Sequence, residues 1–320
     1  MFRRIACLSV LLWLGEGAAR AAPPAADRSV PLRFFALGDL PYRPSEMASL
    51  RQLLRTGATQ GSPFLIHLGD IKGGSTPCTD AGLAEIADLF RIQPVPVVYS
   101  VGDNEWTDCH RRDAGGLDPR VRLQRVRTLF FHDRSVLRLD VLAPIRADPG
   151  YPEIYAFRQG EVLLVALHVV GSNNGFAPAD PAAVAEFRAR DAVNRRFVER
   201  LTASPAGRTA RAMVLIVQAN PLFESGAGPE GFRGFKSMLA DLMGTFPGPV
   251  LVLHGDTHRF RQDRPLLDRS RGVPFERLVR VEVPGSPLSG GVWIAVDPEA
   301  AEPFVAKPVY AAALDPLQSP

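Results

Sequence analysis

Short apolar runs that end at a glycine and an aspartate recur along this chain. Residues 33–37, 64–68, 95–101 and 250–253 are runs of strand length, and each is followed within two residues by a Gly-Asp pair. Nearly continuous apolar strands are typical of a parallel sheet that is buried on both faces. In open α/β sheets the chemistry lies beyond the carboxyl ends of the strands, which is where these aspartates stand.

Segments with helical spacing of apolar residues alternate with these runs. The pattern predicts helices over residues 46–55, 79–90, 120–130, 181–201 and 235–243. It predicts further strands over 154–158 and 162–170, joined as a hairpin, and over 211–217, 278–283 and 292–296. The early β-α-β order followed by late hairpins favours two sheets that face each other with helices outside. The tail after Asp297 is rich in proline and alanine, and we expect it to lie on the surface.

The composition of the chain limits the class of protein but does not indicate a functional site. The 320 residues are 46% hydrophobic and 22% charged, which is ordinary for a globular protein. No repeat or linker divides the chain, so we expect a single domain over 22–320. The net charge is +3, and residues 1–21 contribute +2 of it, which leaves about +1. Such a small charge predicts neither nucleic-acid binding nor adsorption to a membrane.

The first 21 residues have the pattern of a secretory signal peptide. Arg3 and Arg4 precede an apolar run from Ile5 to Leu14, and Ala19 and Ala21 stand where a signal peptidase requires small residues. The apolar run is too short to span a bilayer, although an uncleaved anchor remains the alternative. The mature chain is therefore expected to be periplasmic or secreted, without stable membrane insertion.

Two cysteines, Cys78 and Cys109, remain after removal of that segment. In an exported protein an even number of cysteines favours a disulfide, and two free buried thiols are the alternative. Each cysteine follows a Gly-Asp loop, and the two loops are expected to be neighbours at one edge of a sheet. A bridge would close a loop of about thirty residues and contribute about 3 kcal/mol.

The four Gly-Asp loops together resemble a known family. The loops Gly38-Asp39, Gly69-Asp70, Gly102-Asp103-Asn104-Glu105 and Gly255-Asp256-Thr257-His258 occur in the order found in calcineurin-like metallophosphoesterases, which include purple acid phosphatases. The resemblance spans roughly residues 32 to 262. It implies an α/β fold, a four-layer α/β/β/α sandwich of two mixed sheets flanked by helices, with two metals about 3.5–4 Å apart at the strand ends.

The resemblance also implies roles for individual residues. Asp70 would bridge two metals, Asp39 and His258 would hold one of them, and Asp103 and Asp256 would hold the other. Asn104 stands at a ligand-loop position where the family has the histidine that protonates the leaving group, and an asparagine is not a general acid. His110 and His254 are candidates to replace that acid.

Three family ligand positions have also lost their histidine. Pro41 follows Asp39 and Leu40 where the family has Asp-x-His, with Tyr42 as a substitute ligand; Ala219 and Asp256 replace two further histidines. The remaining set is rich in oxygen and favours Mg²⁺, Mn²⁺ or Ca²⁺ over Zn²⁺, with iron as a further alternative. The site could hold one cation or two. The alternative is that an arginine neutralises the carboxylates in place of a metal.

Four more polar residues stand at strand ends that could face the same site. Asn173, Asn174 and Arg259, together with Ser286, are candidates to bind an anionic substrate, and ordinary turn chemistry is the alternative for the asparagines and Ser286. The sequence thus predicts an exported, metal-dependent hydrolase of a small phosphate mono- or diester. The alternative is a family member that binds a metal or an anionic ligand without turnover.

Overall fold

The computed structural model describes residues 31–225 and 228–314. The predicted signal peptide and the predicted domain start at residue 22 lie outside these residues. The described residues form one compact unit. Among their helices, none combines the length and apolar character needed to cross a membrane.

The first sheet carries three of the four Gly-Asp loops. Its strand order is β14-β13-β1-β2-β3; β1, β2 and β3 are parallel, and β13 pairs antiparallel with both β1 and β14. The carboxyl ends of β1, β2 and β3 therefore meet at one edge. The strands are β1 (Leu32–Leu37), β2 (Leu65–His67), β3 (Val97–Tyr99), β13 (Gly290–Val296) and β14 (Phe304–Tyr310).

The second sheet carries the fourth Gly-Asp loop, which follows β8. Its order is β4-β5-β6-β7-β8-β12-β9, and β6, β7, β8 and β12 run parallel. The strands are β4 (Ile145–Arg146), β5 (Tyr155–Gln159), β6 (Val162–Ala166), β7 (Ala212–Ile216), β8 (Val250–His254), β12 (Leu278–Glu282) and β9 (Arg261–Asp263). A separate hairpin consists of β10 (Leu267–Asp268) and β11 (Val273–Pro274).

Helices cover the outer faces of the sheets. Three of the longer helices begin at a side-chain cap: Thr79 accepts from Gly82 N, and Asp118 and Asp180 cap helices that start with proline. The helices are α1 (Met47–Thr59), α2 (Asp80–Arg91), α3 (Pro119–Val126), α4 (Arg134–Leu137), α5 (Gly171–Asn174), α6 (Pro181–Ala203), α7 (Pro205–Arg208), α8 (Arg233–Thr245) and α9 (Ala311–Leu314). Single turns are η1 (Pro44–Glu46), η2 (Thr107–His110), η3 (Arg127–His132), η4 (Leu139–Leu142), η5 (Phe223–Ser225) and η6 (Glu230–Phe232).

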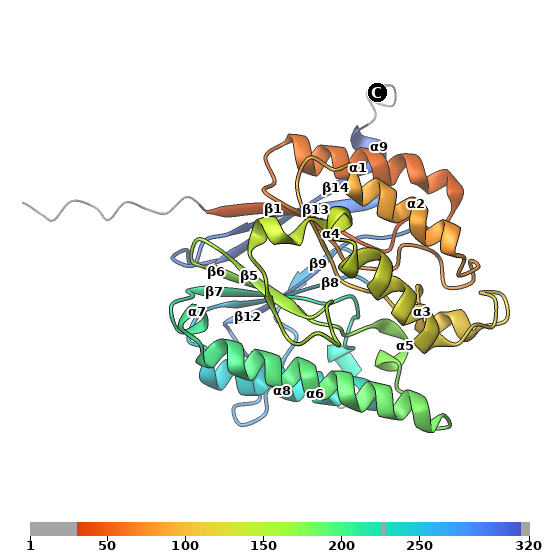
Figure 1. Ribbon diagram of the computed structural model, residues 1–320. Helices are drawn as coiled ribbons and strands as arrows, with labels where there is room; N and C mark the ends of the chain where they lie inside the picture. The colour runs from red at the N-terminus through yellow and green to blue at the C-terminus, as the bar shows by residue number, and fades with distance from the viewer. Residues whose placement is uncertain (1–30, 226–227, 315–320) are drawn as a thin grey trace, which may run out of the picture. The chain divides into compact units, whose positions relative to one another are not determined.

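Alternation along the second sheet divides the hydrophobic core in two. On β6, Leu164 faces the core shared with the first sheet, whereas Leu163 and Val165 face the core formed with α6 and α8. Figure 1 shows α1 and α2 on one side of the two sheets and α6 and α8 on the other. The predicted four-layer α/β/β/α sandwich of two mixed sheets is therefore confirmed.

One detail of the predicted organisation is wrong and another is incomplete. Residues 278–283 and 292–296 do not pair as a hairpin, because β12 belongs to the second sheet and β13 to the first. The tail lies at the surface as expected, but its strand β14 also pairs along the whole of β13 at the edge of the first sheet. Period-2 patterning identifies strands but not their partners, and the Pro and Ala content of the tail hid a regular edge strand.

Candidate functional site

The four Gly-Asp loops interlock through their backbones. Asp39 N donates to Gly69 O (3.0 Å), which joins the first loop to the second. Asp256 N donates to both carboxylate oxygens of Asp39 (2.9 and 3.0 Å), which joins the fourth loop to the first across the two sheets. Asn104 N donates to Asp70 Oδ1 (3.1 Å). The structure thus brings together the four aspartates that the sequence singled out. We call Asp39, Asp70, Asp103 and Asp256 the carboxylate cluster.

The backbone of this cluster is strained. Asp39, Asp70, Asp256 and His258 have φ values of 52°, 53°, 81° and 62°, in the left-handed region that residues other than glycine rarely adopt. Each such residue costs about 1–3 kcal/mol and persists only where the surrounding structure enforces it. Strained residues concentrate at functional sites, so their occurrence in three cluster aspartates and the adjacent histidine favours a functional role.

Tyr42 lies at the centre of the site. Its hydroxyl donates to Asp70 Oδ2 (2.8 Å) and accepts from Asn104 Nδ2 (3.0 Å), and it lies 3.1 Å from His258 Nε2. The rings of Tyr42 and His258 meet edge to face at 5.0 Å between centroids. Burial and the charge of Asp70 raise the pKa of Tyr42, so the hydroxyl keeps its proton. The sequence marked Tyr42 only as a substitute ligand, because its position gave no sign of these three contacts.

His258 is oriented by the connection between β12 and β13. Its Nδ1 lies 2.7 Å from Ser286 O, and because a carbonyl can only accept, Nδ1 carries a proton. Nε2 therefore faces the cluster, 3.6 Å from Asp39 Oδ1. Ser286 is itself fixed, since its N donates to Asp39 O (2.9 Å) and its Oγ donates to Glu46 (2.7 Å). The sequence indicated Ser286 only as a polar residue at a strand end, because nothing local predicts that it orients His258.

The cluster is electrostatically unfavourable as it stands. Burial, followed by the charge of Asp256, raises the pKa of Asp39, and burial, followed by the charge of Asp103, raises that of Asp70. Burial and Asp103 raise the pKa of Asp256 to about 7. Within residues 31–225 and 228–314, no lysine or arginine forms an ion pair with a member of the cluster. The alternative of a neutralising arginine therefore finds no support.

The donor chemistry of the cluster fits a divalent cation. Asp103 Oδ1 is buried without a hydrogen-bond partner, and the surrounding carboxylates lack a compensating positive charge. The ligand shell is not assembled, however: among the described residues no group of three His, Cys, Asp or Glu side chains is arranged to hold a metal. One reason is the Tyr42 hydroxyl, which lies in hydrogen-bond distance of both Asp70 and His258.

Glu105 links the second and third Gly-Asp loops by hydrogen bonds. The side chain is fully buried, and its Oε1 accepts from Asp70 N (3.2 Å), Gly102 N (2.8 Å) and Tyr99 Oη (2.5 Å). A buried carboxylate that accepts several bonds fixes the groups that donate them. Glu105 thus sets the position of Asp70 without facing the site.

A polar chain leads outward from Asp103. Ser172 Oγ lies 2.7 Å from Asp103 Oδ2 and 2.8 Å from Asp108 Oδ1, so it joins the two carboxylates. Asp108 Oδ2 pairs in turn with Arg111 Nη2 at 2.8 Å. Burial and the charge of Asp103 raise the pKa of Asp108 to about 6. The sequence did not single out Asp108 or Arg111, which lie well beyond the end of β3 at Tyr99.

The remaining candidates lie at or near the site with different surroundings. His110 is exposed, with Nδ1 2.6 Å from Thr107 O. His254 is fully buried in β8, and burial lowers its pKa to about 4. Asn173 and Asn174 bind backbone groups through their amides, which holds the loop after β6 against Gly231. The Arg259 side chain is exposed beside His258. Their assigned roles stay predictions.

The predicted disulfide between Cys78 and Cys109 is confirmed. The S–S distance is 2.00 Å and the Cα atoms are 5.8 Å apart. Both cysteines are buried with Ala114 in a small separate cluster. The bridge joins the segment that follows Asp70 to η2, which follows Asp103, so it limits the relative movement of two site loops.

A buried ion network braces the third loop from the second sheet. His168 Nδ1 lies 2.8 Å from Glu153 Oε1, which also pairs with Arg127 at 2.5 Å. The Trp106 ring, directly after Glu105, packs on His168 at 5.3 Å and lies under the Arg190 guanidinium. The network therefore connects the end of β6 to the loop that carries Asp103.

This network makes stability depend on pH. Burial alone would raise the pKa of Glu153, but His168 and Arg127 outweigh it and lower the pKa to about 2 from an ordinary 4.5. A lowered folded-state pKa stabilises fully above about pH 4.5, and the stabilisation is lost as the pH falls toward 2. We expect Glu153→Gln to lower the free energy of unfolding at pH 7 by about 3 kcal/mol, with a smaller difference at pH 3. Urea unfolding of both proteins measures this, and an equal difference at both pH values would contradict it.

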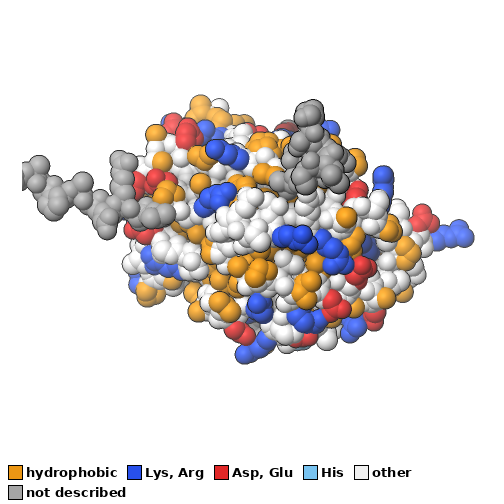
Figure 2. Space-filling view, turned by 90° about the horizontal axis from the view of Figure 1, so that it is seen from above, with side chains coloured by type: hydrophobic (Ala, Val, Ile, Leu, Met, Phe, Trp, Pro, Cys, Tyr) orange, Lys and Arg blue, Asp and Glu red, His pale blue; other side chains and the backbone are white. Residues whose placement is uncertain are grey.

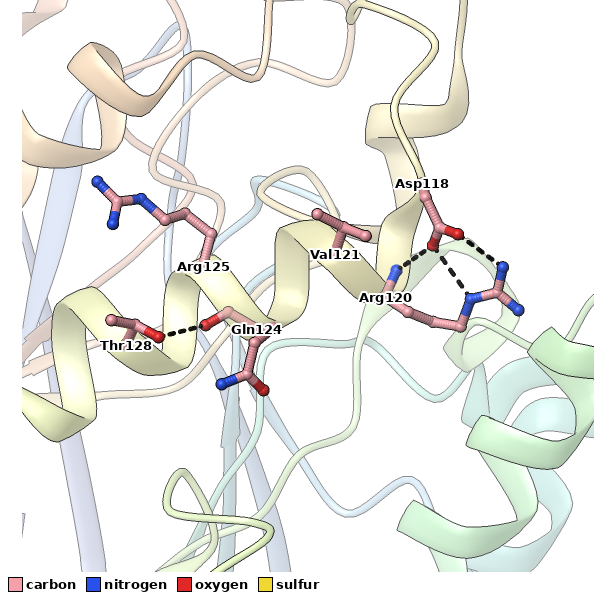
Figure 3. Close-up of a pocket in the computed structure, with 6 residues that line it drawn as sticks. All are labelled: Asp118, Arg120, Val121, Gln124, Arg125 and Thr128. Atoms are coloured by element: carbon pink, nitrogen blue, oxygen red, sulfur yellow. Dashed lines mark hydrogen bonds and ion pairs between the residues drawn. The ribbon is translucent and has the colours of Figure 1, made fainter.

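A hollow of about 640 Å³ on the surface of α3 is not part of this site (Figure 3). Its lining contains no member of the carboxylate cluster, and its charged side chains are already engaged. Asp118 binds Arg120 through both oxygens, at 3.1 and 2.7 Å. This hollow therefore does not extend the carboxylate cluster.

Comparisons with solved structures support the assignment of the fold. No family model and no curated protein matches the sequence. A solved dimetal phosphatase from Danio rerio matches with a TM-score of 0.54 at 12% identity, over 88% of this chain and 97% of that chain. A purple acid phosphatase, PPD1 from yellow lupin (Lupinus luteus) seeds, matches with a TM-score of 0.52 at 13% identity, over 89% of this chain and 52% of that one. This chain thus spans about half of the lupin protein. At such identity the likeness concerns the fold alone, and by it the chain has the calcineurin-like metallophosphoesterase fold of dimetal and purple acid phosphatases.

Proposed function

We propose that this protein is an exported, metal-dependent phosphoesterase with its active centre at the carboxylate cluster. Asp70 would be shared by two cations, Asp39 and His258 would complete one site, and Asp103 and Asp256 the other. Mg²⁺, Mn²⁺ or Ca²⁺ suits these oxygen donors better than Zn²⁺, and iron is compatible.

The observation that carries the proposal is the convergence of four carboxylates, three buried and one half-buried, that pair with no lysine or arginine among the described residues. Raised pKa values for three of them mean that ionising the cluster costs free energy in the protein alone. The free energy of ionising the cluster adds to the backbone strain of its residues. A bound divalent cation would compensate for this cost. The fold adds support, because the Danio rerio protein that shares it is a dimetal phosphatase.

Bound cations would supply a water that is deprotonated near neutral pH and a positive charge for the phosphoryl oxygens. The residues of this chain hold the ligand groups in position. Asp70 and Asp39 are fixed by backbone donors from Asn104 and Asp256, so their oxygens do not reorganise during the reaction. Asn104 stands where the family has an acid, but an amide cannot protonate a leaving group, and both Nδ2 hydrogens are already donated to Tyr42 and Lys72. His110 and His254 stay candidates for proton transfer.

A non-catalytic binding role is the second candidate, and one observation favours it. The Tyr42 hydroxyl already bonds with Asp70 and Asn104 and lies against His258, which are three residues of the predicted site. If this arrangement persists with metal present, the site would hold a cation or an anionic ligand without turning over an ester.

The substrate is proposed to be a small phosphate ester rather than a nucleic acid. On the face seen in Figure 2, acidic and basic side chains are interspersed, without the broad basic surface that backbone phosphates require. The disulfide suits an oxidising compartment, in keeping with a periplasmic or secreted protein.

The experiment is hydrolysis of an aryl phosphate monoester and of a diester by the mature protein. After chelation the rate should fall to background, and Mn²⁺ or Mg²⁺ should restore it. Binding of metal with no turnover of either ester would favour the non-catalytic role, and neither binding nor turnover would reject both.

A further inference from the structure

Arg111 lies at the mouth of the carboxylate cluster. Its Nη2 pairs with Asp108 at 2.8 Å and lies 3.4 Å from Ser172 Oγ. A Cβ added at Gly74 would lie 2.8 Å from Arg111 Nη1 and 3.0 Å from Asn104 Oδ1, so the guanidinium and the Asn104 amide are neighbours. The Arg111 side chain is 45% exposed. One edge of the guanidinium is thus held by protein, and the rest is open to solvent beside Asn104.

Lys72 lies on the same side of Asn104. Its backbone carbonyl accepts from Asn104 Nδ2 (3.0 Å), and its Nζ donates to Gly73 O (2.9 Å). Lys72 and Arg111 are therefore both neighbours of Asn104.

We propose that Arg111, assisted by Lys72, binds the phosphoryl group of a phosphate monoester dianion at this mouth. The inference rests on the proposed function and extends it to a substrate class. A guanidinium presents paired N–H donors that match two phosphoryl oxygens, and a dianion balances two neighbouring cations better than a singly charged diester does.

The structure holds Arg111 ready for this role. Asp108 and Ser172 fix its guanidinium, and Ser172 connects both to Asp103 in the cluster. The disulfide at Cys109 anchors the chain two residues earlier. A side chain that is already ordered loses less entropy when it binds a ligand, which favours affinity.

The test is titration calorimetry of inorganic phosphate and of dimethyl phosphate into the mature protein at pH 8, with Mg²⁺ and with chelator. Arg111→Ala should weaken phosphate binding by about 10- to 100-fold, the value of a charged hydrogen-bonded contact. Arg111→Lys should be intermediate, because it keeps the charge and loses the fork. Arg112→Ala, an exposed neighbour, is the matched control and should bind like the wild type. Dimethyl phosphate should bind more weakly and respond less to Arg111→Ala.

The outcomes separate this inference from the proposed function. Phosphate binding that is absent from the wild type, or unchanged in Arg111→Ala and Arg111→Lys in both buffers, overturns the role of Arg111, even if the protein hydrolyses esters. Tighter binding of dimethyl phosphate than of phosphate overturns the preference for monoesters. Arg111-dependent phosphate binding in a protein that hydrolyses no ester supports the inference while the proposed function fails.

Discussion

Replacement of Asp70 by alanine is expected to lower metal-dependent ester hydrolysis by about a thousandfold or more. The Asp70 carboxylate contacts the third loop through Asn104 N and the first loop through Tyr42, and it lies within Coulomb reach of the other cluster carboxylates. In the proposed function it is the carboxylate that two cations would share. Losing it removes about 4 kcal/mol or more of transition-state stabilisation. The measurement is kcat/KM for an aryl phosphate with saturating Mn²⁺.

Two further variants make this result specific. Asp70→Asn keeps the size of the side chain and removes its charge, and we expect it to be nearly as inactive as alanine. Asp113→Ala removes an exposed aspartate of the loop after η2 and should retain full activity. If Asp70→Ala kept more than a tenth of the wild-type rate, the proposed roles within the cluster would be wrong.

Replacement of Gly69 by alanine is expected to cost about 3 kcal/mol or more of folding stability. Gly69 has φ +77°, and an added Cβ would lie 2.5 Å from Gly102 N and 2.8 Å from Ser100 O. These are backbone atoms, so no side chain can rotate away, and the second and third loops would have to separate. The cost combines left-handed strain of about 1–2 kcal/mol with overpacking of about 1–3 kcal/mol. Urea unfolding measures it.

Gly61 supplies the control for this effect. Its φ of +90° is similar, but an added Cβ would meet no atom within 4 Å. Gly61→Ala should therefore cost only the conformational strain, about 1 kcal/mol. Equal losses for the two variants would mean that the close contact of the two loops does not contribute.

The parts of the fold that the sequence predicted share a local signal. An apolar run that ends in Gly-Asp indicates a buried strand and its carboxyl end, and the parallel order of β1, β2 and β3 places Asp39, Asp70 and Asp103 at one edge of the first sheet. Asp256 follows β8 of the second sheet, and the family resemblance was needed to predict it beside the other three. The disulfide followed from the same reasoning, because Cys78 and Cys109 each lie just beyond one of these loops.

The parts that the sequence could not predict depend on contacts between distant segments. Ser286 orients His258 only because β12 and β13 join different sheets, and strand partners do not follow from patterning. Tyr42 reaches Asp70 and His258 from a loop that looked like a lost ligand position. Arg111 was one of many arginines until Asp108, Ser172 and Gly74 placed it beside Asn104.

The central claim is that the carboxylate cluster exists to hold a divalent cation. Titration calorimetry of Mn²⁺ into the chelated mature protein at pH 7.5 tests it without reference to any substrate. We expect saturable binding of one or two ions per chain, a rise in melting temperature with added Mn²⁺, and loss of both effects in Asp70→Ala. No binding and no change in melting temperature in the wild type, or unchanged binding in Asp70→Ala, would contradict the claim.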